Sequence, residues 1–355
     1  MKKSSLFLFL GKCLSMDDNP LARNVVIKEL TNSSINLKAL FEMGINHSLI
    51  PALYSAFRRN SLLHLLPEGF AELLEQAYGH NLFKNQQILI QANEIFRKFT
   101  DEGIKPLFMK GVSYLMQGLY HDQGERVMTD IDILLAEEDF LRSKEIMREH
   151  GYYHPEGATV NDYENHRHQP PFLHPEGAVP VEIHQYLLPP RYSRFLTVTE
   201  AFNDCTIVEG DKSLILSLRH QQVLQYFHEA HHSRGGLSSL TTLRGMYDFY
   251  LLSRLRRPEA NDISGFWAKK YLQYQYAVNE IFNTQMNDFC YQVPSNLQYL
   301  KKELFLLDHQ WIDGLYTRLV YKPLYFISLA FKGLISVHSR RSLKRKLGGF
   351  FKKPS

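Results

Sequence analysis

The sequence contains little cysteine and no long apolar segment. Its three cysteines, Cys13, Cys205 and Cys290, are far apart and odd in number. This argues against a disulfide framework or a thiolate zinc site and favours a reducing compartment. No run reaches the ~20 apolar residues of a membrane-spanning helix. The apolar core at residues 6–10 is shorter than the roughly 7–15 residues of a signal-peptide core, so we expect a helix to begin here and the protein to be cytoplasmic.

Two local signatures of catalysis are also missing. No Gly-x-Ser-x-Gly turn occurs, and Gly111 stands outside any Gly-x-x-x-x-Gly-Lys-Ser/Thr pattern. Sixteen histidines raise the question of zinc, with one group between His166 and His184 and another at residues 228–232. Because the second group has no further ligand that the sequence identifies, we expect it to pack within a helix.

The net charge of +4 conceals an uneven distribution along the chain. Residues 331–355 carry eight Lys and Arg side chains and no acid, which leaves 33 basic and 37 acidic side chains in the rest. This excess of acidic side chains outside residues 331–355 is not typical of a general nucleic-acid-binding protein. The apolar residues 323–337 before the basic cluster leave two alternatives open. The tail packs on the helical domain, or it attaches peripherally to an anionic membrane.

Hydrophobic periodicity divides the chain into four parts. Apolar residues at three and four spacing predict helices over residues 1–100, and short apolar runs bounded by turn residues predict strands within residues 101–200. Helical patterns return in residues 201–322, and the tail follows at residues 323–355. This order predicts an α+β fold in which a small mixed β-sheet lies between N- and C-terminal helical regions.

Two aspartates interrupt one of the predicted strands. Residues 126–135 read Arg-Val-Met-Thr-Asp-Ile-Asp-Ile-Leu-Leu, which places Asp130 and Asp132 in an apolar run. Side chains two residues apart in a strand project from the same face, so the carboxylates would repel each other with no basic neighbour in the run. We therefore expect them to face a cation, and we expect neutralising either one not to lower metal-free stability. The alternative is an exposed edge strand with two solvated acids.

A strand, a tight turn and a helix are predicted before the aspartates. An apolar stretch at residues 106–109 runs into Lys110 and Gly111 and then into a helical pattern. The first N–H groups of such a helix, together with Lys110 and the Ser113 hydroxyl, suit phosphate.

A third segment follows the aspartates. Residues 179–187 alternate apolar side chains with Glu182 and His184, and a turn signal at residues 175–178 predicts that they form the second arm of a hairpin beside the aspartates. Three carboxylates on neighbouring strands would make a site for one or two Mg²⁺ ions, with Mn²⁺ as an alternative.

The order of these motifs resembles the nucleotidyltransferase superfamily that has the DNA polymerase β-type fold. More closely, the chain resembles a bacterial branch with a helical C-terminal half that carries a His-rich helix and an Arg-x-x-Tyr-Asp segment, here Arg244, Tyr247 and Asp248. The resemblance covers roughly residues 40–255. The chain departs from the superfamily in its turn, which is Gly111-Val112-Ser113 where Gly-Gly or Gly-Ser is usual.

This resemblance implies a Mg²⁺-dependent enzyme that moves a nucleoside monophosphate from a nucleoside triphosphate such as ATP to a hydroxyl, with release of pyrophosphate. It implies that Asp130, Asp132 and Glu182 hold the metal and that His184 orients Glu182 or contacts substrate. The residues that it implies for the nucleotide are Lys110, Gly111, Ser113 and Arg126. The acceptor stays open between a small molecule, a sugar and a protein. A catalytically silent binding or scaffold protein of the same fold is the second hypothesis.

Overall fold

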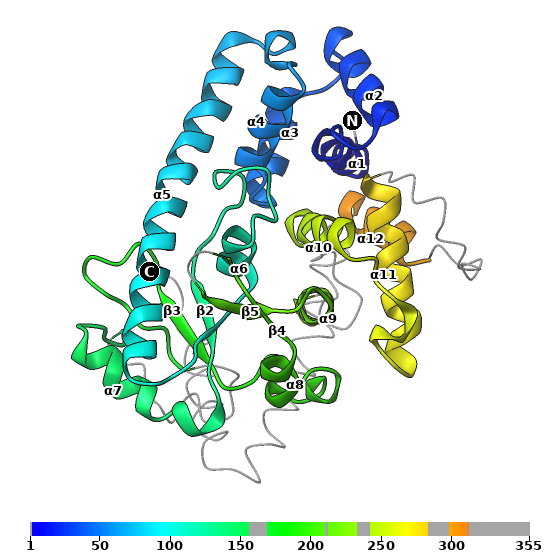
Figure 1. Ribbon diagram of the computed structural model, residues 1–355. Coiled ribbons are helices and arrows are strands. Elements are labelled where there is room, and N and C mark those ends of the chain that lie inside the picture. Colours follow the sequence, from blue (N-terminus) through cyan, green and yellow to red (C-terminus); the bar gives the residue numbers. More distant parts are fainter. Residues whose placement is uncertain are drawn as a thin grey trace, which may run out of the picture.

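A small mixed sheet surrounded by helices confirms the predicted α+β fold (Figure 1). The computed structural model describes residues 2–155, 169–209, 212–232, 242–282, 298–309 and 311. The five strands are β1 (Leu107–Met109), β2 (Ile131–Leu134), β3 (Val181–His184), β4 (Cys205–Ile207) and β5 (Leu214–Leu216). Their order across the sheet is β3-β2-β1-β5-β4.

The pairing within the sheet brings the predicted site strands together. β1 is antiparallel to β2 and parallel to β5, β2 is parallel to β3, and β4 is antiparallel to β5. Every residue of β2 is buried, which excludes the alternative of an exposed edge strand for this segment. As predicted, β3 lies beside the aspartate strand, and Phe172 bridges to Val181 in the manner of a hairpin arm.

Most of the described residues are helical. The long helices and shorter α-helical segments are α1 (Lys3–Leu14), α2 (Pro20–Thr31), α3 (Leu37–Asn46), α4 (Ile50–Arg59), α5 (Glu68–Asp101), α6 (Lys110–Met116), α7 (Arg142–Glu149), α8 (Val198–Asn203), α9 (Leu218–His232), α10 (Leu243–Leu255), α11 (Phe266–Phe282) and α12 (Gln298–Asp308). As predicted, a helix begins near Leu6. Gly151 follows the C-terminus of α7 with a φ of +81°, which glycine adopts readily.

The first helix joins the N-terminal and C-terminal helical regions. α1 lies beside α11 and α12 (Figure 1), and Ser4 donates to Asp308 through its backbone N–H at 2.9 Å and its hydroxyl at 2.7 Å. A Cβ on Gly11 would lie 2.6 Å from the Ile281 side chain, so glycine permits this close approach. The two helical regions are therefore in contact with each other as well as with the sheet.

The long helix α5 holds two segments of the sheet region through buried amides. Asn81 and Asn85 each donate to the carbonyl of Arg126, at 3.0 and 2.8 Å, in the loop before β2. Gln91 donates to the Val179 carbonyl at 3.0 Å and accepts from its N–H at 3.2 Å, just before β3. Backbone groups in these irregular segments thus find the partners that burial requires.

The sheet extends further along the chain than predicted. Residues 201–322 were expected to be helical, yet β4 and β5 lie at residues 205–216 and β5 pairs with β1. Each has only three residues, too few to show a two-residue periodicity, which is why the pattern did not reveal them.

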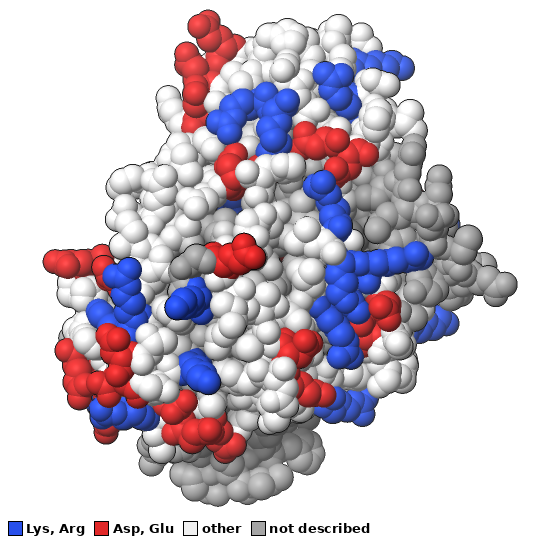
Figure 2. Space-filling model, in the orientation of Figure 1, with Lys and Arg blue, Asp and Glu red and all other residues white. Residues whose placement is uncertain are grey.

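No helix in the described part of the chain is long and apolar enough to cross a membrane. On the face that Figure 2 shows, Lys and Arg side chains lie among Asp and Glu side chains and do not form one continuous basic area. The tail at residues 323–355 lies outside the described residues, as do Cys290, His166 and His168.

Candidate active site

Three polar side chains converge where β2 and β3 pair. Asp132 on β2 lies opposite Glu182 on β3, and His184 follows two residues later on the same face of β3. The ligand atoms of these three residues all lie within 4.8 Å of one another. Glu182 is the most exposed, with 24% of its side chain accessible against 4% for Asp132 and 1% for His184. The group therefore opens to solvent on the side of Glu182.

Asp130 lies one residue before β2, outside this group of three but close enough to sense its charge. Burial raises the pKa of Asp130, and the charges of Asp132 and Glu182 raise it further, whereas Lys110 and Arg126 act in the opposite direction. The structure thus brings the three predicted carboxylates into one electrostatic neighbourhood, with Asp130 at its margin.

Lys110 contacts the aspartate strand directly. It follows β1 at the start of α6, as the strand–turn–helix prediction requires, and its backbone has a φ of +51°. Its Nζ lies 2.7 Å from Asp132 Oδ1, and His184 Nε2 lies at the same distance from the same oxygen. Burial alone would raise the pKa of Asp132, but the Lys110 ammonium and the His184 hydrogen bond outweigh it and lower that pKa well below its ordinary value.

The rest of the turn is closely packed. Ser113 is buried and its hydroxyl donates to the Lys110 carbonyl at 2.8 Å, so this hydroxyl stabilises the first turn of α6. A Cβ on Gly111 would lie 2.5 Å from Arg126 Nη1 and 3.0 Å from Met128 Sδ. Glycine is therefore needed here because the Arg126 side chain passes directly against the backbone.

Arg126 is held behind this turn by the C-terminal helical region. Its Nη2 donates to Asp248 Oδ2 at 2.9 Å and its Nε to Asp248 Oδ1 at 3.3 Å. Arg126 is 8% exposed and Asp248 1%, and the Tyr120 hydroxyl also donates to Asp248. The guanidinium lies over the Tyr114 ring, 5.4 Å from its centroid. The sequence identified Asp248 only as part of the Arg-x-x-Tyr-Asp segment and gave it no role. In the structure it is the carboxylate that holds Arg126 in place.

The residue before Arg126 is anchored to the N-terminal helices. Glu125 is 1% exposed and accepts from Ser55 Oγ at 2.8 Å, and it pairs with Arg59 of α4. Burial raises the pKa of Glu125 to about 7, and Asp122 adds to the rise while Arg59 and Ser55 oppose it. The loop that leads to Asp130 is therefore held between the two helical regions.

This buried acid predicts a pH dependence of stability. Because the pKa of Glu125 is higher in the folded protein than its ordinary 4.5, the folded state retains this proton as pH rises and loses stability up to about pH 7. Glu125→Gln should remove this loss. The difference in free energy of unfolding between the variant and the wild type should therefore shift in favour of the variant by about 3 kcal/mol as the pH rises from 4.5 to 8. Urea titrations at fixed ionic strength measure this. Parallel profiles would contradict it, and the exposed Glu72→Gln is the matched control.

The prediction that the second histidine group only packs within a helix overlooked a zinc-binding pattern. Residues 228–232 read His-Glu-Ala-His-His, which has the His-Glu-x-x-His spacing of zinc-binding helices. In the structure Glu229 is buried and accepts from the Thr242 N–H at 3.1 Å, at the start of α10. The side chains of His231 and His232 lie outside the described residues. Glu229 thus serves the packing of α9 on α10.

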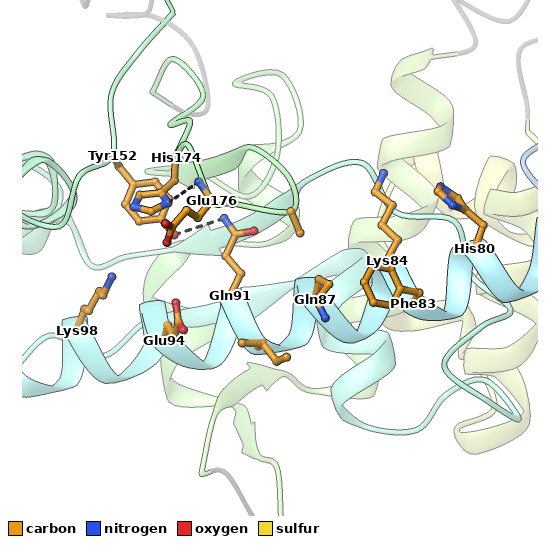
Figure 3. Close-up of a pocket in the computed structure, with 13 residues that line it drawn as sticks. His80, Phe83, Lys84, Gln87, Gln91, Glu94, Lys98, Tyr152, His174 and Glu176 are labelled. Atoms are coloured by element: carbon orange, nitrogen blue, oxygen red, sulfur yellow. Dashed lines mark hydrogen bonds between the residues drawn. The ribbon is translucent and has the colours of Figure 1, made fainter.

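A separate pocket of about 470 Å³ lies along α5 (Figure 3). Phe108 of β1 contacts Phe96 of α5 and is paired with Ile133, so α5 covers the sheet face opposite the one that carries Asp132. Lys84, Glu94 and the neighbouring α5 side chains line this pocket together with the turn before β3. None of its lining residues belongs to the acidic group.

The donor set of the acidic group fits a divalent cation. In their ionised forms Asp130, Asp132 and Glu182 carry three negative charges, and Lys110 supplies one positive charge. Arg126 is already balanced by Asp248. The surplus of two negative charges equals one divalent ion. Carboxylate oxygens suit both Mg²⁺ and Mn²⁺.

Part of the chain is similar to a known protein family. A family model described as uncharacterised nucleotidyltransferase matches residues 33–270, which include all five strands, the acidic group and Asp248. No curated protein and no solved structure matches the chain significantly.

Proposed function

The chain belongs to the uncharacterised nucleotidyltransferase family, and on this basis we propose that it transfers a nucleoside monophosphate from a nucleoside triphosphate to a hydroxyl and releases pyrophosphate. The observation that supports this most is the pairing of Asp132 with Glu182 across β2 and β3, with Asp130 beside them and a surplus of negative charge. Such a group needs a cation, and transfer from a triphosphate uses one.

Asp132 and Glu182 would hold the metal, with Asp130 at its margin and His184 fixing the carboxylate of Asp132. A bound Mg²⁺ supplies charge stabilisation to the phosphate oxygens. Glu182, the most exposed of the three clustered side chains, is best placed to accept the proton of the acceptor hydroxyl.

The β1–α6 turn would bind the triphosphate. Lys110 is the partly exposed cation of this turn, and Gly111 leaves room for the Arg126 side chain to pack against its backbone. Arg126 lies directly behind Gly111 in its ion pair with Asp248, and it would support the turn by packing against its backbone. The Ser113 hydroxyl is used inside the turn, so its role is to shape the turn.

The test is incubation of the purified protein with Mg²⁺ or Mn²⁺ and each α-labelled nucleoside triphosphate in turn. We expect metal-dependent release of pyrophosphate and transfer of label to an added small molecule, a sugar or the protein itself. A protein that binds nucleotide but releases no pyrophosphate under any of these conditions would instead support a silent binding protein.

Glu182→Gln separates proton acceptance from metal binding. We expect kcat to fall on the order of 10²- to 10³-fold, because a positioned base typically contributes that much. The concentration of Mg²⁺ that gives half-maximal rate should change less than kcat. Steady-state kinetics at several Mg²⁺ concentrations measure both, with the exposed Glu176→Gln in the turn before β3 as the matched control. A normal rate together with lower stability would make Glu182 a structural residue of the sheet.

A further inference from the structure

Lys110 occupies the place at Asp132 that a metal would need. Asp132 Oδ1 accepts from Lys110 Nζ and from His184 Nε2, each at 2.7 Å, so the two main acceptor directions of that oxygen are used. A cation at Oδ1 must displace one of these donors. A cation at the other carboxylate oxygen would lie within the ~4–6 Å range at which like charges repel strongly.

The two donors differ in how readily they can leave. His184 is 1% exposed and belongs to β3, whose backbone is paired with β2. Lys110 has a flexible side chain that is 16% exposed, and it lies in a turn with a φ of +51°. Lys110 is therefore the donor that can move, while His184 keeps Asp132 oriented.

We propose that Lys110 is an internal substitute for the metal at Asp132, and that binding of the triphosphate draws Lys110 away and so favours metal binding. The inference rests on the proposed function, because it requires a triphosphate at the β1–α6 turn. In the free protein the ammonium partly neutralises the acidic group and weakens its affinity for a divalent cation. In the complex the phosphates offer Lys110 another anionic partner, and Asp132 becomes available. Nucleotide and metal then bind with positive coupling through this side chain.

Two binding measurements on one variant test the inference, and neither requires catalytic activity: the affinity for Mn²⁺ should rise and the affinity for nucleoside triphosphate should fall. Lys110→Met keeps the length of the side chain and removes its charge. We expect the nucleotide-free variant to bind Mn²⁺ at least about tenfold more tightly than the wild type, measured by the electron paramagnetic resonance of free Mn²⁺. We expect the same variant to bind nucleoside triphosphate about tenfold or more weakly in EDTA, measured by equilibrium dialysis.

Two further variants define the controls. Lys105→Met removes an exposed lysine just before β1 and should change neither affinity, and Lys110→Arg should stay near the wild type for Mn²⁺. Unchanged or weaker Mn²⁺ binding by a folded Lys110→Met protein would overturn the inference while leaving the proposed transfer intact. If Mn²⁺ binds to Lys110→Met and to the double variant Lys110→Met/Asp132→Asn with the same affinity, Asp132 is not a metal ligand, and the inference fails together with the metal site.

Discussion

Replacing Asp132 by Asn is expected to abolish nucleotidyl transfer, with a loss in rate on the order of 10³-fold or more. The change keeps the shape of the side chain and removes the charge that would hold the metal opposite Glu182. Pyrophosphate release under saturating nucleotide and Mg²⁺ measures the effect. Glu138→Gln, an exposed acid shortly after β2, is the matched control and should keep near-normal activity. Near-normal turnover by Asp132→Asn would contradict the site assignment.

Neutralising Asp130 and neutralising Asp132 should have different effects on stability in the absence of metal. The sequence alone predicted that neither change would lower stability, and the structure changes this prediction for Asp132. Asp132 is charge-paired with Lys110 and hydrogen-bonded to His184, so neutralising it should lower the free energy of unfolding by about 1.5–3 kcal/mol. The pKa of Asp130 is raised by burial and by its acidic neighbours, so Asp130→Asn should hold or raise stability. Urea titrations in EDTA compare the two. A gain in stability for Asp132→Asn would contradict the pairing with Lys110.

Asp248→Ala is expected to destabilise the protein by about 3–5 kcal/mol, because it leaves the buried Arg126 guanidinium without its carboxylate. The effect should also reach the site, since Arg126 lies against the Gly111 turn. Denaturant unfolding measures the first effect, and nucleotide affinity measures the second. Glu102→Ala breaks an exposed pair with Arg142 and should cost at most about 1 kcal/mol, which makes it the matched control.

A double variant distinguishes loss of the ion pair from loss of packing. If the damage in Asp248→Ala comes from an unpaired buried charge, then Arg126→Met combined with Asp248→Leu should recover most of the stability. It should not recover nucleotide binding, because the guanidinium that packs against the backbone of Gly111 is gone. Equal instability of the single and double variants would show that packing on α10 matters more than the pair.

The sequence revealed the site strands because their signals are local. Apolar residues alternate with Asp132 on β2 and with Glu182 on β3, and that alternation is typical of a strand with one polar face. The Lys110–Gly111 turn between β1 and α6 was likewise evident from a change of periodicity. These features need only neighbouring residues, so one sequence was sufficient.

The partners of the site residues could not be predicted in this way. Lys110 reaches Asp132 because β1 pairs antiparallel with β2 and brings Met109 opposite Asp132, a register that no local pattern gives. Asp248 meets Arg126 across 122 positions of sequence. Both contacts depend on how the helical regions and strands pack together. Local periodicity carries no information about such packing.

The metal site is best tested by locating Mn²⁺, through its anomalous scattering, in crystals grown with a non-hydrolysable nucleoside triphosphate. We predict a peak about 2.1 Å from carboxylate oxygens of both Asp132 and Glu182, with the phosphates at the β1–α6 turn and the Lys110 ammonium moved from Asp132 toward them. A nucleotide bound elsewhere, or a turn-bound nucleotide with no metal between these two carboxylates, would contradict this prediction.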